Sequence, residues 1–182
     1  MNIFGKVISV MLLTAAALGT ANAQSSSFGT TWSFSGIGIS YDSIDDNGTI
    51  VHAGLQLELS ENFLGRRGEP GVSGSVAWSS VIAKTESRNG NTVLFHAGPG
   101  IMAGYCKDFR VEKGENQAGI AFGLMGRIGT TIVYDRNINI SICLAPMIGV
   151  HLTSSDENTN MKYYRYGLLR ALMPEIGIQY RF

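Results

Sequence analysis

The chain has 182 residues, with 14 Lys and Arg residues against 14 Asp and Glu residues and only two cysteines. This balance of charge leaves no basic footprint for nucleic acid and no polybasic patch for a membrane surface. Cys106 and Cys143 are too few for a disulfide framework, and the sequence favours free or buried thiols over a structural bond between them, although export to an oxidising compartment would allow one.

Residues 1–23 have the pattern of a secretory signal peptide. Lys6 supplies the positive charge, residues 7–18 are apolar, and Ala21-Asn22-Ala23 is a small-x-small cleavage site. A membrane anchor is the alternative, but the apolar run is shorter than the roughly 20 residues that a spanning helix needs. Cleavage would leave residues 24–182 as one domain, with no cysteine after the site to carry a lipid.

The remaining chain alternates apolar residues with small or polar ones. The longest run, 138–152, has Ile, Leu, Pro or Val at every even position. A period of two predicts β-strands, and this run is longer than the 3–10 residues usual for strands of soluble proteins. In chain order we expect strands near residues 31–41, 51–59, 72–82, 93–105, 120–134, 138–152 and 163–182.

Short and long connections alternate between these strands. Short ones are an Asn-Gly turn at 88–91 and a tight connection at 135–137, whereas the segments 61–71, 107–117 and 153–162 are longer and polar. This arrangement is typical of membrane barrels, which have short turns at one end and long loops at the other.

The less apolar face indicates which way the sheet faces. A soluble barrel turns its apolar face inward, and a membrane barrel turns it to lipid. The opposite face is rich in Gly, Ala, Ser and Met, and residues 118–152 contain no Lys and no Glu. We therefore predict a packed polar barrel interior without an open pore, in which charged residues form internal salt bridges and do not act as gating charges. The residues predicted to lie in this interior are His52, Glu58, His96, Arg127, Glu175 and Arg181.

Arg170 conflicts with this pattern. On an unbroken final strand it would face lipid with Leu172 and Ile176, at a cost of about 2–4 kcal/mol near the midplane. Either a bulge changes the alternation near 167–171, or Arg170 lies near the outer interface. We expect the second, because Arg170 is far along the strand from the C-terminus.

The chain ends in "IQYRF", and its apolar residues Ile176, Ile178, Tyr180 and Phe182 alternate up to the last position. This ending is similar to the C-terminal signal that the barrel-insertion machinery reads in small bacterial outer-membrane β-barrel proteins. The stretches "AGPGIMAGY" and "YDRNINIS" resemble the outer-membrane β-barrel domain common in Bacteroidetes.

The resemblance implies an all-β, antiparallel, up-and-down transmembrane β-barrel of eight strands in the bacterial outer membrane. Outer-membrane lipid and the insertion machinery would be its partners, and we expect a monomer that binds no nucleic acid. Seven strands are clear in the sequence. The eighth must come from residues 24–31 or from a stretch that reads as loop.

The sequence offers one weak catalytic candidate. His151 and Thr153 in "HLTS" resemble the His-x-Ser of lipid A deacylases, but Thr replaces Ser and no Glu lies at a matching distance near Arg165. A nucleophile needs a base and an orienting group, so we expect no enzyme activity. The alternatives are a lipid-modifying barrel enzyme and a soluble periplasmic carrier.

The three histidines, His52, His96 and His151, lie on separate predicted strands without the spacing of metal ligands, so we expect no metal and no cofactor. The expected role is structural or carried by the loops 61–71, 107–117 and 153–162, whose ligand the sequence leaves undefined.

Overall fold

The structure, a computed structural model, describes residues 23–59, 70–87, 90–108, 118–134, 137–155 and 158–182. The predicted signal peptide lies outside the described residues, apart from Ala23. Within these described ranges, no helix is long and apolar enough to cross a membrane.

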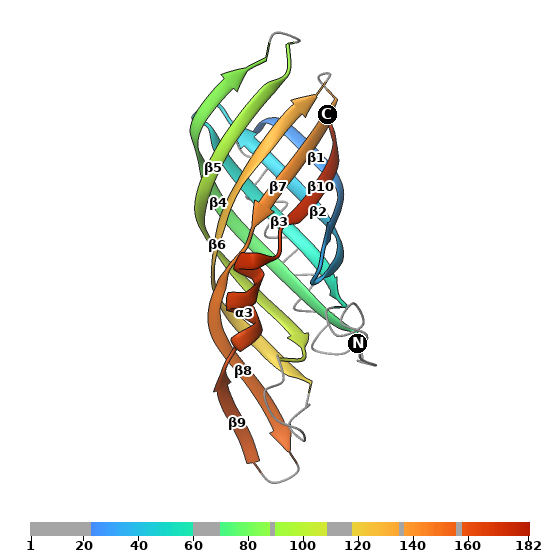
Figure 1. Cartoon of the computed structure of the whole chain (residues 1–182), viewed down its shortest axis with the longest axis vertical. Helices are drawn as coiled ribbons and strands as arrows, with labels where there is room; N and C mark the ends of the chain where they lie inside the picture. Colours follow the sequence, from blue (N-terminus) through green and yellow to red (C-terminus); the bar gives the residue numbers. More distant parts are fainter. Residues whose placement is uncertain (1–22, 60–69, 88–89, 109–117, 135–136, 156–157) are drawn as a thin grey trace.

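Ten strands and one short helical segment make up the described chain (Figure 1). The elements are β1 (Ala23–Ser33), β2 (Gly36–Asp45), β3 (Thr49–Glu58), β4 (Gly71–Glu86), β5 (Thr92–Cys106), β6 (Gly119–Tyr134), β7 (Ile138–Leu144), β8 (Met147–Ser155), β9 (Asn158–Tyr163), α3 (Arg165–Leu169), η1 (Arg170–Leu172) and β10 (Glu175–Arg181).

The strands form one closed antiparallel sheet. The order is β5-β4-β3-β2-β1-β10-β7-β6-β8-β9, and pairing of β5 with β6 closes the ring through β7 and β10. Eight strand positions therefore surround the barrel, because β8 continues β7 and β9 precedes β10 along the same wall. The predicted antiparallel, up-and-down, eight-stranded barrel is confirmed.

The predicted strand 138–152 is interrupted without a change of register. Ile128 pairs with Leu144 and Met125 with Met147, so Ala145 and Pro146 lie opposite Arg127 and Gly126. Proline has no N–H to donate to a ladder. Its carbonyl still accepts a hydrogen bond from the Gly126 N–H at 2.9 Å. The interruption is therefore local, and β7 and β8 act as one wall strand.

The predicted strand 163–182 is wrong in its first half. Tyr163 lies opposite Val150 and Glu175 lies opposite Cys143, so 12 steps along this strand span 7 steps of its neighbour. The surplus of five residues is absorbed by helix. Eight helical residues at about 1.5 Å each, instead of about 3.3 Å, shorten the path by about 14 Å, or about four extended residues.

This helix also corrects the placement of Arg170. The preferred explanation, a strand residue near the outer interface, is wrong. Arg170 belongs to η1 and is buried, 7% exposed. Because the surplus is an odd number of residues, it reverses which positions face outward between β9 and β10. The bulge that we did not prefer would have had the same effect.

The missing eighth strand is β1. The stretch 31–41, predicted as one strand, is two strands joined by a tight turn at Phe34 and Ser35. Its signal is weak because serines and threonines occupy both faces of β1.

The first and last residues of the barrel lie at the same end as its short turns. Ala23 pairs with Asp45 beside the turn at Gly48, and Phe182 is near Ser26, whose carbonyl accepts its N–H at 2.9 Å. We call this the terminal end and the opposite one the loop end. The predicted turns at 88–91 and 135–137 are only partly described, and residues 60–69, 109–117 and 156–157 of the three predicted loops lie outside the described residues.

Candidate functional site

The outward face of the barrel is apolar. On β6, Leu124 is 71% and Ile128 56% exposed, whereas the intervening Arg127 is 3% exposed. Exposed large apolar residues occur on nearly every strand: Phe28, Trp32, Ile37, Ile39, Leu57, Trp78, Phe95, Ile101, Ile142, Ile148, Ile176 and Ile178. A soluble sheet buries such residues, so this is the inside-out polarity of an outer-membrane-type barrel.

Aromatic residues border this apolar outward face, which we call the belt, at the terminal end. Phe28 lies opposite both Tyr41 and Tyr180, and Tyr180 lies opposite Ile138, which faces Tyr134. Aromatic girdles of this kind mark the membrane–water interface of barrels. The belt therefore has the edge that a bilayer requires.

The barrel interior is filled by polar side chains from different strands. Of the residues predicted to lie there, His52, Glu58, His96 and Arg127 are buried, and the Glu175 side chain is 16% exposed. Arg181 is half-buried at the terminal end, where its N–H donates to the Asn137 carbonyl at 2.7 Å.

Two contacts between an acidic and a basic side chain lie in the half of the interior nearer the terminal end. Arg127 Nη1 on β6 donates to Glu175 Oε1 on β10 at 3.0 Å, across β7. Asp42 and His52 face each other on β2 and β3, with Oδ1 and Nδ1 2.5 Å apart. The sequence did not single out Asp42; the signal available was its position opposite an interior histidine across a hairpin.

Gln179 extends the polar interior across the pairing of β10 with β1. Its Oε1 accepts from Ser27 on β1 at 3.0 Å, and its Nε2 donates to Ser40 on β2 at 2.8 Å. One buried side chain thus links three neighbouring strands.

A third ionic contact lies toward the loop end. Arg170 Nη2 donates to Glu58 Oε1, and the same carboxylate oxygen accepts from the Ser73 hydroxyl. The predicted set of interior residues included Glu58 but not Arg170. The available signal was the conflict of Arg170 with the alternation.

The other two histidines have separate partners. His96 Nε2 lies 3.1 Å from Thr131 Oγ1, and His151 Nε2 donates to the Cys106 carbonyl at 2.9 Å. Within the described part of the chain, no group of three His, Cys, Asp or Glu residues could hold a metal ion. Cys106 and Cys143 are both buried free thiols.

The weak catalytic candidate is not arranged as a base and a nucleophile. His151 is buried, and the nitrogen that a base would use is bound to a backbone carbonyl. Thr153 lies two residues on along β8 and is partly exposed. A histidine base must reach the hydroxyl that it deprotonates.

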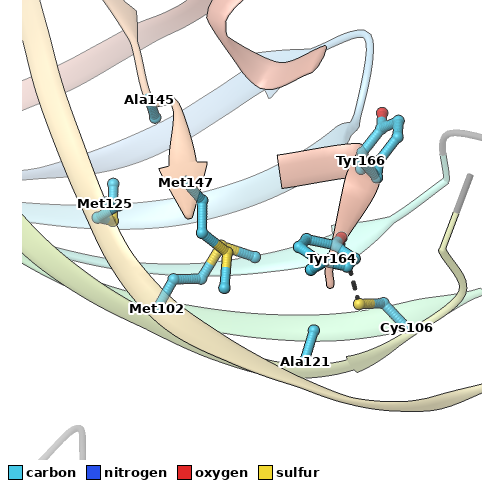
Figure 2. Close-up of a cluster of buried hydrophobic side chains, with 8 residues drawn as sticks. All are labelled: Met102, Cys106, Ala121, Met125, Ala145, Met147, Tyr164 and Tyr166. Carbon is cyan, nitrogen blue, oxygen red and sulfur yellow. Dashed lines mark hydrogen bonds between the residues drawn. The ribbon is translucent and has the colours of Figure 1, made fainter. Parts of the chain in front are cut away.

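An apolar cluster replaces the polar filling near α3 (Figure 2). Tyr164 is central to it: its hydroxyl lies 3.4 Å from Cys106 Sγ, and its ring lies 5.9 Å from that of His151. We call this set the methionine cluster: Met102, Cys106, Ala121, Met125, Ala145, Met147, Tyr164 and Tyr166.

No family model matches the chain, and no curated protein matches it. The predicted Bacteroidetes-type resemblance therefore stays a prediction. Among solved structures, the chain is similar to Ail, the attachment invasion locus protein of Yersinia pestis, at 13% identity and a TM-score of 0.37 over 88% of this chain and 99% of that one. The structure of Ail with the heparin analogue sucrose octasulfate matches at 14% identity and a TM-score of 0.36, over 87% and 97%. At this identity and TM-score the similarity does not support an assignment. The assignment as an outer-membrane-type barrel depends on the chain's own strand pairing and polarity.

Proposed function

We propose that this chain is a non-enzymatic protein of the bacterial outer membrane with a structural or surface-binding role. The observation that carries the proposal is the polarity of the closed barrel: an apolar belt outside and paired polar groups inside. The three interior contacts join different elements of the wall: β2 to β3, β6 to β10, and η1 to β3. Side chains that pair with one another in this way stabilise the wall.

Residues 1–23 would be removed during export, and the insertion machinery would read the strand that ends at Phe182. Ile176, Ile178 and Tyr180 are exposed on the outward face of β10, as the predicted signal requires. Ligand binding, if it occurs, would belong to the loops 61–71, 107–117 and 153–162 at the loop end.

Cell fractionation tests this proposal. We expect the mature chain in the outer-membrane fraction, with an electrophoretic mobility in SDS that changes on boiling, because a closed barrel resists detergent until heated. A soluble periplasmic band without a heat shift would contradict the proposal and favour the carrier.

The enzyme alternative has its own test. His151→Ala should leave the cellular lipid profile unchanged by mass spectrometry, because His151 Nε2 binds the Cys106 carbonyl instead of a hydroxyl. Loss of a modified lipid species, in a variant that keeps its heat shift, would contradict a non-enzymatic role.

A further inference from the structure

The hydrogen-bonded wall is incomplete toward the loop end. β10 pairs with β1 only over Glu175–Arg181 and Ser27–Ser33, after which β1 turns back into β2. In the described chain, β9 pairs with β8 and no other strand. Between these places the wall is continued by α3 and η1, which connect β9 to β10 (Figure 1).

A helical wall segment can move where a strand cannot. A central strand shares its backbone hydrogen bonds with both neighbours, and breaking them in lipid leaves groups without partners. The α3–η1 segment belongs to no strand ladder, and its helical hydrogen bonds lie within the segment itself. It can therefore swing away without breaking a ladder, although the backbone groups at its two ends need other partners.

Apolar residues lie on both sides of this segment, together with the exposed Arg165 and the buried Arg170. Its outward residues Leu168 and Leu172 are 48% and 80% exposed. On its inward side lies the methionine cluster (Figure 2). Leu169 and Met173 also pack against this cluster. On this side of the barrel, the segment lies between the cluster and the surroundings of the barrel.

The composition of the cluster suits an adaptable apolar ligand. Met102, Met125 and Met147 belong to it, and methionine is unbranched, flexible and polarizable, so it repacks readily around different shapes. Nine positions separate Met173 from Phe182, which at about 3.3 Å per residue and a tilt of about 45° places Met173, where it packs against the cluster, about 21 Å from the terminal end. This depth is near the loop-end edge of an apolar band about 25 Å tall.

Polar contacts hold the segment in place at both ends. Asp108, beyond β5, accepts from the backbone N–H of Arg165 at 3.2 Å and of Tyr166 at 2.9 Å. At the other end Arg170 pairs with Glu58 on β3 and donates to Met102 Sδ at 3.2 Å. Glu58 Oε2 and Arg170 Nε are buried without a hydrogen-bond partner, so this attachment is incompletely satisfied.

We propose that the α3–η1 segment is a lateral lid and that the methionine cluster takes the aliphatic chain of a membrane lipid when the lid opens. The inference rests on the membrane location proposed above. It assigns a lipid-binding site to the loop-end half of the interior, which the structural or loop-binding role does not include.

Methyl NMR in nanodiscs tests this inference. The deuterated mature chain would carry ¹³C-labelled Met and Leu methyl groups in dimyristoyl phosphatidylcholine with protonated chains, with chain-deuterated lipid as the blank. We expect NOEs from lipid chains to the methyl groups of Met102, Met125 and Met147. Exposed Leu124, beside Met125 on β6, is the positive control, and buried Leu94 on β5 is the negative one.

A pair of matched variants tests the lid. Glu58→Gln with Arg170→Met removes the attachment of η1, and Glu175→Gln with Arg127→Met removes a similar ion pair that does not touch the lid. We expect the first double variant to strengthen the methionine NOEs several-fold and the second to change them much less. Equal changes in both would contradict the lid.

Failure of this inference can be distinguished from failure of the proposed function. Absence of chain NOEs at Leu124 would mean that the belt does not face lipid, which overturns the proposed function. Chain NOEs at Leu124 without any at the three methionines, in the native chain and in the lid variant if it folds, would overturn this inference alone.

Discussion

At the scale of single residues, the two buried arginines show what alternation can and cannot predict. Arg127 lies on an unbroken strand, so its parity with Ala121 and Met125 was enough to place it inside. Arg170 lies in helix, where successive side chains turn by about 100° and parity has no meaning. Its partner Glu58 is 112 positions away, a pairing that no local pattern contains.

The Arg170–Glu58 pair should be stabilising only as a pair. Arg170→Met alone leaves a buried carboxylate unpaired, so we expect the free energy of unfolding to fall by about 3–5 kcal/mol. Glu58→Gln together with Arg170→Met should recover most of that loss. Urea unfolding, monitored by the change in electrophoretic mobility of the folded barrel, measures the stability of both variants.

An exposed pair provides the control. Lys84 and Glu86 lie 3.3 Å apart with side chains 58% and 68% exposed. Lys84→Met should change stability by less than about 1 kcal/mol. The account is contradicted if the double variant at Glu58 and Arg170 is as unstable as the single one.

Gly167 gives a prediction of opposite sign to helix propensity. Alanine in a helix is normally favoured over glycine by about 1 kcal/mol. At Gly167, however, a Cβ would lie 2.6 Å from the Met147 carbonyl oxygen, because α3 lies directly against β8. We expect Gly167→Ala to lower the urea midpoint.

Gly126→Ala is the matched control for this change. There the nearest neighbour of an added Cβ, Pro146 Cγ, would be at an ordinary 3.7 Å. A higher midpoint for Gly167→Ala than for the native chain would show that α3 does not contact β8 so closely.

At the scale of elements, the strands were predictable and their interruptions were not. The residues of α3 and η1 are mostly apolar but include Arg165, Gly167 and Arg170, no side chain caps either N-terminus, and the segment is only two helical turns long. What requires a helix there is the surplus of five residues between two registers, which depends on pairings with β7 and β8. β1 was missed because Ser and Thr do not mark a face.

Lipid contact along β6 predicts a depth-dependent cost of charge. Ile128 is exposed near the middle of the belt, so Ile128→Arg should destabilise the barrel by about 2–4 kcal/mol. Thr85→Arg, on an exposed position near the terminal end of β4, should cost little. Urea titration in lipid vesicles compares them, and equal costs would contradict a lipid-facing belt.

At the scale of the whole molecule, alternation alone fits a soluble barrel and a membrane barrel equally. The composition of the second face decided between them, since small residues and isolated charges suit a narrow packed interior and not a wet surface. The methionine cluster was outside the reach of that reasoning. Its members come from β5, β6, β8 and the chain around α3, and the sequence gives no sign that they meet.

The central claim is that even positions of β6 face lipid and odd positions face a packed interior. Single nitroxide labels from 120 to 132, in a chain with Cys106→Ala and Cys143→Ala, would report accessibility to oxygen and to a polar nickel complex in vesicles. The account predicts a period of two, with high oxygen and low nickel accessibility at Ile120, Phe122, Leu124 and Ile128. High nickel accessibility at these four positions would mean that they face water, and the inside-out barrel would be wrong.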